Sequence, residues 1–151
     1  MVLSTKSSEA PHLCIVEDDI DDQYLITNVL KKLSIEVFIS IFNRGDAVLN
    51  YLSLHEAQFN QLPDLILLDL NMPSTDGIGV LKKLRRQPIA QFIPVVIFTT
   101  SKSPTDFKRV LELGASSCII KPSNYDDMVC VLDTTCRYWF EVSRVYKEIW
   151  Y

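Results

Sequence analysis

The chain has 151 residues, of which 48% are apolar and 23% charged, and its formal net charge is −4. This composition predicts one globular domain with a sizeable core and excludes disordered and fibrous classes. A mildly acidic chain without a basic run disfavours a nucleic-acid partner, and no apolar run approaches the ~18 residues of a membrane span. The N-terminus lacks the apolar stretch of a signal peptide, so we expect a cytoplasmic protein with no membrane partner.

Short apolar runs bounded by Asp, Asn or Pro are typical of strands buried on both faces. Segments with helical spacing of apolar residues alternate with these runs. The predicted strands are His12–Val16, Ile35–Phe42, Leu65–Leu68, Val95–Phe98 and Cys118–Ile120. The helical spacings are seen in Leu25, Ile26, Val29, Leu30 and Leu33, in Ala47, Val48 and Tyr51, in Ile78, Leu81 and Leu84, and in Phe107, Val110 and Leu111. Such alternation predicts an α/β fold of the flavodoxin-like type, a doubly wound (βα)5 sandwich with a five-stranded parallel sheet and helices on both faces.

The chain divides into three expected parts. Residues 1–11 are polar and expected to be flexible, residues 12–140 form the domain, and residues 141–151 extend it. A heptad-like series connects the fifth helix to the chain end: Met128, Leu132, Thr135, Trp139, Val142, Tyr146 and Ile149. Its first members must cover the sheet. From about Trp139 we expect the helix to leave the domain, so the aromatic tail either folds back or, as we favour, pairs with a second copy in a homodimer.

The four cysteines lie in apolar segments and form no C-x-x-C pair. Because only two histidines are present and neither lies at a ligand spacing, a zinc site or a histidine-based triad is not expected. We predict buried, reduced thiols.

Acidic residues follow two of the predicted strands. Glu17 and Asp18 end the first strand and Asp69 ends the third, and the carboxyl ends of parallel strands meet in one crevice. Carboxylates about 5 Å apart repel by roughly 3 kcal/mol per pair, so the group must take up protons or hold a cation. Oxygen ligands alone favour Mg²⁺. The alternative, that these acids only cap helices, suits Asp19 or Asp21 but not Asp69.

Two further side chains converge on the same crevice. Lys121 ends the fifth strand and Thr99 the fourth. A carboxylate beside Mg²⁺, with an ammonium and a hydroxyl opposite, has the inventory for in-line attack on phosphorus, with an acyl phosphate on Asp69 as product. A lone Lys at a strand end is more commonly a solvated charge, and a β-branched Thr is common as the last residue of a strand. Because Lys121 and Thr99 are expected to lie beside the three acids, we favour their roles in phosphoryl transfer.

These pieces carry a family resemblance. VEDD at 16–19, LILLDLNMPSTDG at 65–77, PVVIFTTS at 94–101 and LGASSCIIKP at 113–122 resemble the receiver domain of response regulators in bacterial two-component systems. The resemblance covers residues 12–140 and extends loosely to the single-domain regulators paired with phytochromes. Because the chain ends soon after the predicted fifth helix, we expect a stand-alone regulator without a DNA-binding output domain.

The resemblance implies a role for each matching residue. Asp69 would be the phosphoacceptor and Glu17 and Asp18 the acidic pair, with Asp18 the more direct Mg²⁺ ligand. Asn71 would offer its backbone carbonyl to the metal, Thr99 would be the switch hydroxyl, and Lys121 would bind the phosphoryl group, in a bond to Pro122 that is often cis. The expected partners are a sensor histidine kinase or phosphotransfer protein and a downstream protein target. We expect no enzyme in the ordinary sense, since such a domain catalyses only its own phosphorylation and dephosphorylation.

One position departs from the family pattern. Cys118 stands where the family usually has Tyr or Phe, so signalling by rotation of a ring is not expected. This leaves open an interaction module that works without phosphorylation. A dehalogenase-type phosphatase is disfavoured because its second Asp would fall at Asn71. A flavodoxin-like redox module is disfavoured because the acids after the first strand would repel a phosphate.

Overall fold

The computed structural model describes residues 10–73 and 75–143. The sheet strands are β1 (His12–Val16), β2 (Phe38–Phe42), β3 (Leu65–Leu68), β6 (Val95–Thr99) and β7 (Ser117–Ile120). The helices are α1 (Ile20–Lys32), α2 (Gly45–Leu54), α3 (Gly77–Arg86), α4 (Pro104–Glu112) and α5 (Tyr125–Arg137). Short elements complete the described chain: the strands β4 (Asn71–Met72) and β5 (Thr75–Asp76), the 3-10 turns η1 (Phe59–Gln61) and η2 (Ala90–Phe92), and the π-helical turn η3 (Tyr138–Val142).

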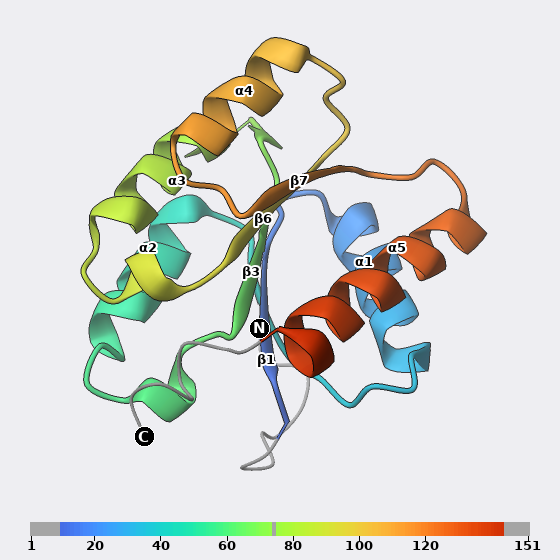
Figure 1. The fold of residues 1–151 in the computed structure, drawn as a ribbon, viewed down its shortest axis with the longest axis horizontal. Coiled ribbons are helices and arrows are strands. Elements are labelled where there is room, and N and C mark those ends of the chain that lie inside the picture. The colour runs from blue at the N-terminus through green and yellow to red at the C-terminus, as the bar shows by residue number, and fades with distance from the viewer. Residues whose placement is uncertain (1–9, 74, 144–151) are drawn as a thin grey trace.

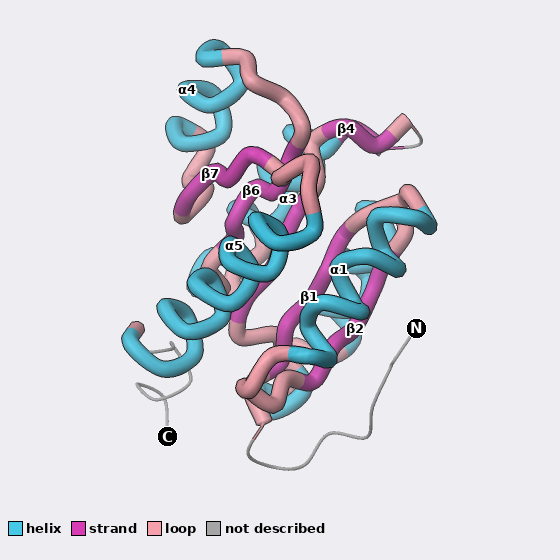
Figure 2. Tube along the Cα trace, turned by 90° about the vertical axis from the view of Figure 1, so that its right-hand side faces the viewer, coloured by secondary structure: helices cyan, strands magenta, loops and turns pink. Residues whose placement is uncertain are grey.

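The five long strands form one parallel sheet in the order β2-β1-β3-β6-β7. Helices α1 and α5 lie side by side on one face, and α2, α3 and α4 cover the other (Figure 1; Figure 2 shows the face of α1 and α5). The change in strand order places β1 and β3 next to each other, with their carboxyl ends at one edge. This is the doubly wound architecture that the alternating pattern predicts.

The core has two layers, one on each side of the sheet, because successive strand residues point to opposite faces. In β1, Leu13 and Ile15 face α1 and α5, whereas Cys14 and Val16 face α2 and α3. The same alternation in β3 and β6 explains why these strands read as continuous apolar runs. The rigid sheet fixes the strand ends from which the site is built.

The predicted strands agree with the structure at four positions to within one residue at either end. The exception is the predicted strand Ile35–Phe42, which begins only at Phe38. Pairing with β1 starts at His12 opposite Phe38, so the preceding residues have no strand beside them. Ile35 and Val37 instead pack at the edge of the α1–α5 core.

The C-terminal helix does not continue as the heptad series predicts. Met128, Leu132 and Thr135 are buried against the sheet, as expected. Helix α5 then gives way to the π-helical turn η3, closed by a 2.7 Å hydrogen bond from the backbone N of Ser143 to the carbonyl of Tyr138. The wider turn shifts the register, and Trp139 packs on the chain's own core. Trp139 therefore still belongs to the domain, within the predicted bounds of residues 12–140, and the expected pairing or folding back of the tail stays a prediction, since residues 144–151 lie outside the described part.

The thiol prediction is correct for Cys14 and Cys136, which are buried, and all four cysteines are free. It is wrong for Cys130, which is exposed on α5, and only partly right for the half-buried Cys118. Among the described residues, none of the helices has the length and apolar character needed to cross a membrane.

Candidate functional site

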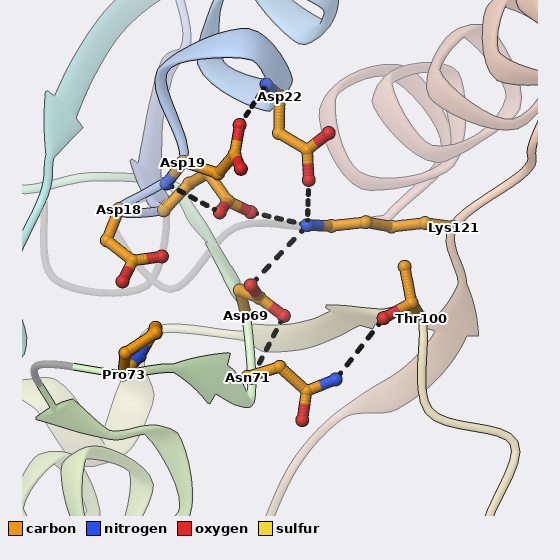
Figure 3. Close-up of a pocket in the computed structure, with 9 residues that line it drawn as sticks. Asp18, Asp19, Asp22, Asp69, Asn71, Pro73, Thr100 and Lys121 are labelled. Atoms are coloured by element: carbon orange, nitrogen blue, oxygen red, sulfur yellow. Dashed lines mark hydrogen bonds and ion pairs between the residues drawn. The ribbon is translucent and has the colours of Figure 1, made fainter.

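A pocket of about 410 Å³ opens where the carboxyl ends of β1, β3 and β7 meet. Figure 3 shows the polar side chains that converge on it. Its lining residues are Glu17, Asp18, Asp19, Asp22, Asp69, Asn71, Pro73, Thr100 and Lys121. Five carboxylates therefore face a single ammonium, and the predicted acids and lysine are brought together in one place.

The three acids expected to hold a cation lie close enough to share one. Glu17, Asp18 and Asp69 each offer a carboxylate oxygen, and these oxygens lie within 4.8 Å of one another. Glu17 and Asp69 are only 2% and 5% exposed, so their charges are poorly screened by water. Hard oxygen donors in this arrangement fit a divalent cation such as Mg²⁺ or Mn²⁺.

The loop that carries Asp69 is shaped by the chain that follows it. Strand β4 pairs with β5 antiparallel, with Asn71 opposite Asp76. Asp76 also caps α3 by accepting a 3.1 Å hydrogen bond from the backbone N of Ile78. Because the chain reverses directly after the strand, Asp69 stays at the sheet edge and is not drawn into a helix.

Lys121 is buried and contacts three carboxylates. Its Nζ lies 2.5 Å from Glu17 Oε2, 2.8 Å from Asp22 Oδ2 and 3.5 Å from Asp69 Oδ2. Burial alone would lower the pKa of Lys121, but the hydrogen bonds with Asp22 and Glu17 outweigh burial and raise it. Burial raises the pKa of Glu17 to about 7 against the lowering effect of Lys121, and the charge of Asp69 adds to the rise. Lys121 therefore keeps its charge near neutral pH.

Thr99 lies at the end of β6 and is fully buried. Its hydroxyl oxygen accepts hydrogen bonds from the Asn71 side-chain amide and the Ser101 backbone N, both 3.2 Å away. The same Asn71 amide lies 3.3 Å from the hydroxyl of Thr100, which lines the pocket. Asn71 thus links the end of β3 to the end of β6 through its side chain, a contact that the sequence did not indicate.

Four pocket residues fall outside the predicted site: Asp19, Asp22, Pro73 and Thr100. Asp19 is the N-cap of α1 and accepts hydrogen bonds from the backbone N atoms of Asp21 and Asp22. This agrees with the expectation that Asp19 or Asp21 caps this helix. Asp22 lies in the first turn of α1, directly after the acids that end β1, but nothing in the sequence shows that it faces the pocket. Its partner Lys121 lies 99 residues away, and no local pattern reports such a contact.

The bond between Lys121 and Pro122 is trans, so the cis form that the resemblance implies is not found. Cys118 lies in β7 opposite Ile97, where it packs against the core on the side of α2, α3 and α4.

Comparison with known proteins agrees with this geometry. Residues 13–133 match the response regulator receiver domain family. The chain is 34% identical over 132 residues to the "Probable methanogenesis regulatory protein FilR2" of Methanothrix harundinacea, covering 87% of this chain and 85% of that protein. It is 32% identical over 140 residues to response regulator Rcp1 of Synechocystis sp., covering 92% and 95%.

Solved structures show the same fold. The phosphorylated cyanobacterial phytochrome response regulator RcpA superposes with a TM-score of 0.81 at 27% identity, over 91% of this chain and 99% of that one. The Mn²⁺-bound form of Rcp1 superposes with a TM-score of 0.78 at 32% identity, over 89% and 98%. The family match spans most of the chain, and the acidic pocket stands at the sheet edge where a doubly wound fold places its ligands. The chain therefore belongs to the response regulator receiver domain family of two-component systems.

Proposed function

We propose that this protein is a single-domain response regulator that accepts a phosphoryl group on Asp69 from a histidine kinase, a phosphotransfer protein or a small phosphodonor. The observation that carries the proposal is the close grouping of three carboxylates and one ammonium. The carboxylates of Glu17, Asp18 and Asp69 lie within 4.8 Å of one another, and Lys121 Nζ stands 3.5 Å from the Asp69 oxygen. One pocket thus holds acidic ligands for a metal ion, the nucleophile Asp69 and the ammonium of Lys121, which can pair with phosphoryl oxygens.

In the proposed reaction, an Asp69 oxygen attacks the phosphorus in line, the new O–P bond forms, and the donor's bond to phosphorus breaks with its electron pair leaving on the donor. Glu17, Asp18, Asp69 and the backbone carbonyl of Asn71 would hold Mg²⁺. When bound, Mg²⁺ neutralises charge on the transferred group and orients it.

The protein's own groups complete the site. Lys121 pairs with a phosphoryl oxygen, and the Thr99 hydroxyl, once released by the Asn71 amide, donates to another. Burial of the Asp69 carboxylate strengthens the electrostatic contacts made to it. The domain would catalyse only its own phosphorylation and dephosphorylation, and it would signal by binding a downstream protein.

The experiment is phosphorylation by acetyl phosphate in the presence of Mg²⁺, followed by mass spectrometry of the intact protein. The expected result is a gain of one phosphoryl group that is lost in Asp69→Asn and on chelation of the metal. Asp46→Asn, which removes an exposed carboxylate on α2, is the matched control and should label like the wild type. Stoichiometric labelling of Asp69→Asn would refute the assignment of the phosphoacceptor.

The second candidate is an interaction module that works without phosphorylation. The observation that favours it is Cys118, which has no ring to couple a shift of Thr99 to the surface of β7. The same labelling experiment separates the two, since a wild-type chain that stays unlabelled with both acetyl phosphate and a kinase would support the second candidate.

A further inference from the structure

The ammonium of Lys121 is not centred on the phosphoacceptor. It lies 3.5 Å from Asp69 Oδ2 but only 2.8 Å from Asp22 Oδ2, on the first turn of α1. Glu17, at the end of β1, is nearer still. Figure 3 shows the Lys121 side chain reaching across the pocket from the end of β7 towards Asp22 and Asp69. The two closest acceptors therefore hold the ammonium on the side of α1, away from Asp69.

Asp22 is well placed to act as a fixed anchor. Its backbone N donates a 3.0 Å hydrogen bond to the Asp19 carboxylate, which caps the helix. A carboxylate in the first turn is stabilised by the partial positive charge of the helix N-terminus. Its side chain is 38% exposed, against 5% for Lys121, so Asp22 lies on the water-facing side of this ion pair.

The position of the ammonium matters because Lys121 and a divalent cation both bind the Asp69 carboxylate. With Asp22 in place, Lys121 has two nearer acceptors, and its contact with Asp69 is the longest of the three. Without Asp22, the ammonium has only Glu17 and Asp69 to satisfy its three donors, and it would move towards Asp69. A shorter Lys121–Asp69 pair would then occupy oxygens that the cation and the phosphoryl donor need.

We propose that Asp22 is a positioning residue, which holds the Lys121 ammonium against α1 so that the Asp69 carboxylate stays open to a divalent cation and to the phosphoryl donor. The inference rests on the proposed function for its meaning, but the contact itself can be tested without any phosphodonor. In this way α1, which carries Asp22, would help to set the reactivity of the Asp69 carboxylate at the end of β3.

The test compares Asp22→Ala with Asp21→Ala. Both variants remove one carboxylate from the same helical turn, but Asp21 is exposed and lies outside the pocket. The first measurement is the Mg²⁺ dissociation constant by calorimetry on the full chain. We expect Asp22→Ala to bind on the order of fivefold more weakly than Asp21→Ala, the size of one partly exposed ion pair.

The second measurement is the ¹⁵N resonance of the Lys121 ammonium, identified by its loss in Lys121→Ala. In metal-free protein, the Lys121 ammonium protons should exchange faster and the resonance should shift in Asp22→Ala but not in Asp21→Ala. Asp22→Asn keeps the shape and one acceptor oxygen, and should restore part of the protection. Circular dichroism confirms that each variant is folded.

A Lys121 resonance that does not move in Asp22→Ala would overturn the proposal whatever the change in Mg²⁺ affinity, because Asp22 would then act only as one more negative charge near the site. That result would leave the proposed function standing, since phosphorylation of the wild type is judged separately. Conversely, a wild type that binds Mg²⁺ but is never phosphorylated would refute the proposed function and not the position of Lys121.

Discussion

Gly77 begins α3 directly beside the backbone that carries Asp69. A Cβ atom at this position would lie 2.4 Å from the carbonyl oxygen of Asp69 and 2.7 Å from Cα of Leu70, whereas real Cβ contacts are essentially never shorter than 3.0 Å. Both obstacles are backbone atoms, which cannot rotate away as a flexible side chain can. The Gly77→Ala substitution must therefore displace the segment after β3.

The size of the effect follows from two opposing contributions. Inserting a methyl group into packed structure costs about 1–3 kcal/mol, and the upper part of this range applies because backbone has to move. Replacing Gly by Ala in a helix returns at most about 0.5–1 kcal/mol. We expect Gly77→Ala to lower the free energy of unfolding by about 1–2 kcal/mol, which lowers Tm by about 2–8 °C for a domain of this size.

Gly79, in the same helix, is the matched control. Its added Cβ would come no closer than 3.4 Å to the Asp76 carboxylate, an ordinary contact. Gly79→Ala should therefore raise Tm by about 1–4 °C through helix propensity alone. Thermal unfolding followed by circular dichroism measures both, and Mg²⁺ titration should show weaker binding only for Gly77→Ala. A Gly77→Ala variant at least as stable as Gly79→Ala would refute the reasoning.

Arg85 donates hydrogen bonds to three backbone carbonyls, at 2.8, 2.9 and 3.0 Å, that join α3 to η2 and to the turn before β7. Arg85→Met keeps the apolar stem but removes these three hydrogen bonds, and should lower the free energy of unfolding by about 2–3 kcal/mol in urea denaturation. A thiol reagent at pH 8 should modify Cys130 first in the native protein, read by peptide mass mapping. Burial raises the pKa of Cys14 and Cys136 to about 12, so both should stay unmodified until unfolding. Because these thiols ionise near pH 9 only when unfolded, stability should fall as the pH rises from 9 towards 12. Sedimentation of the full chain should show a dimer at tens of micromolar and a monomer after truncation at Ser143; two monomers would refute pairing through the tail.

The sequence predicts well those features that repeat with a regular period. Strand β3 is fully buried and the edge strand β7 only partly, but a polar residue follows each apolar run, so the runs alone locate the carboxyl edge with Asp69 and Lys121. The start of β2 is not predictable in this way. Ile35 and Val37 are apolar because they pack beside α1 and α5, and apolar packing outside the sheet imitates a strand in the sequence.

Contacts between segments that lie far apart in the chain cannot be predicted from the sequence, for a different reason. An acid in the first turn of a helix is ordinarily explained by the helix dipole, and Asp22 fits that explanation, whereas Asp19 is the cap. The contact of Asp22 with Lys121 depends on how α1 and β7 are placed by the sheet. Likewise, the side chain of Asn71 reaches Thr99 and Thr100 only because β3 and β6 are neighbours.

The uneven charge of the pocket explains why the cation and the phosphoryl group should depend on each other. The ammonium of Lys121 contacts Glu17, Asp22 and Asp69, of which Glu17 and Asp69 are the most buried, whereas Asp18 and Asp19 lie nearer to water. One ammonium leaves five carboxylates strongly under-compensated, and this excess favours a divalent cation. An incoming phosphoryl group brings further negative charge into the same volume. It can be accommodated only after that excess has been balanced, so cation binding should precede phosphoryl transfer and not merely accompany it.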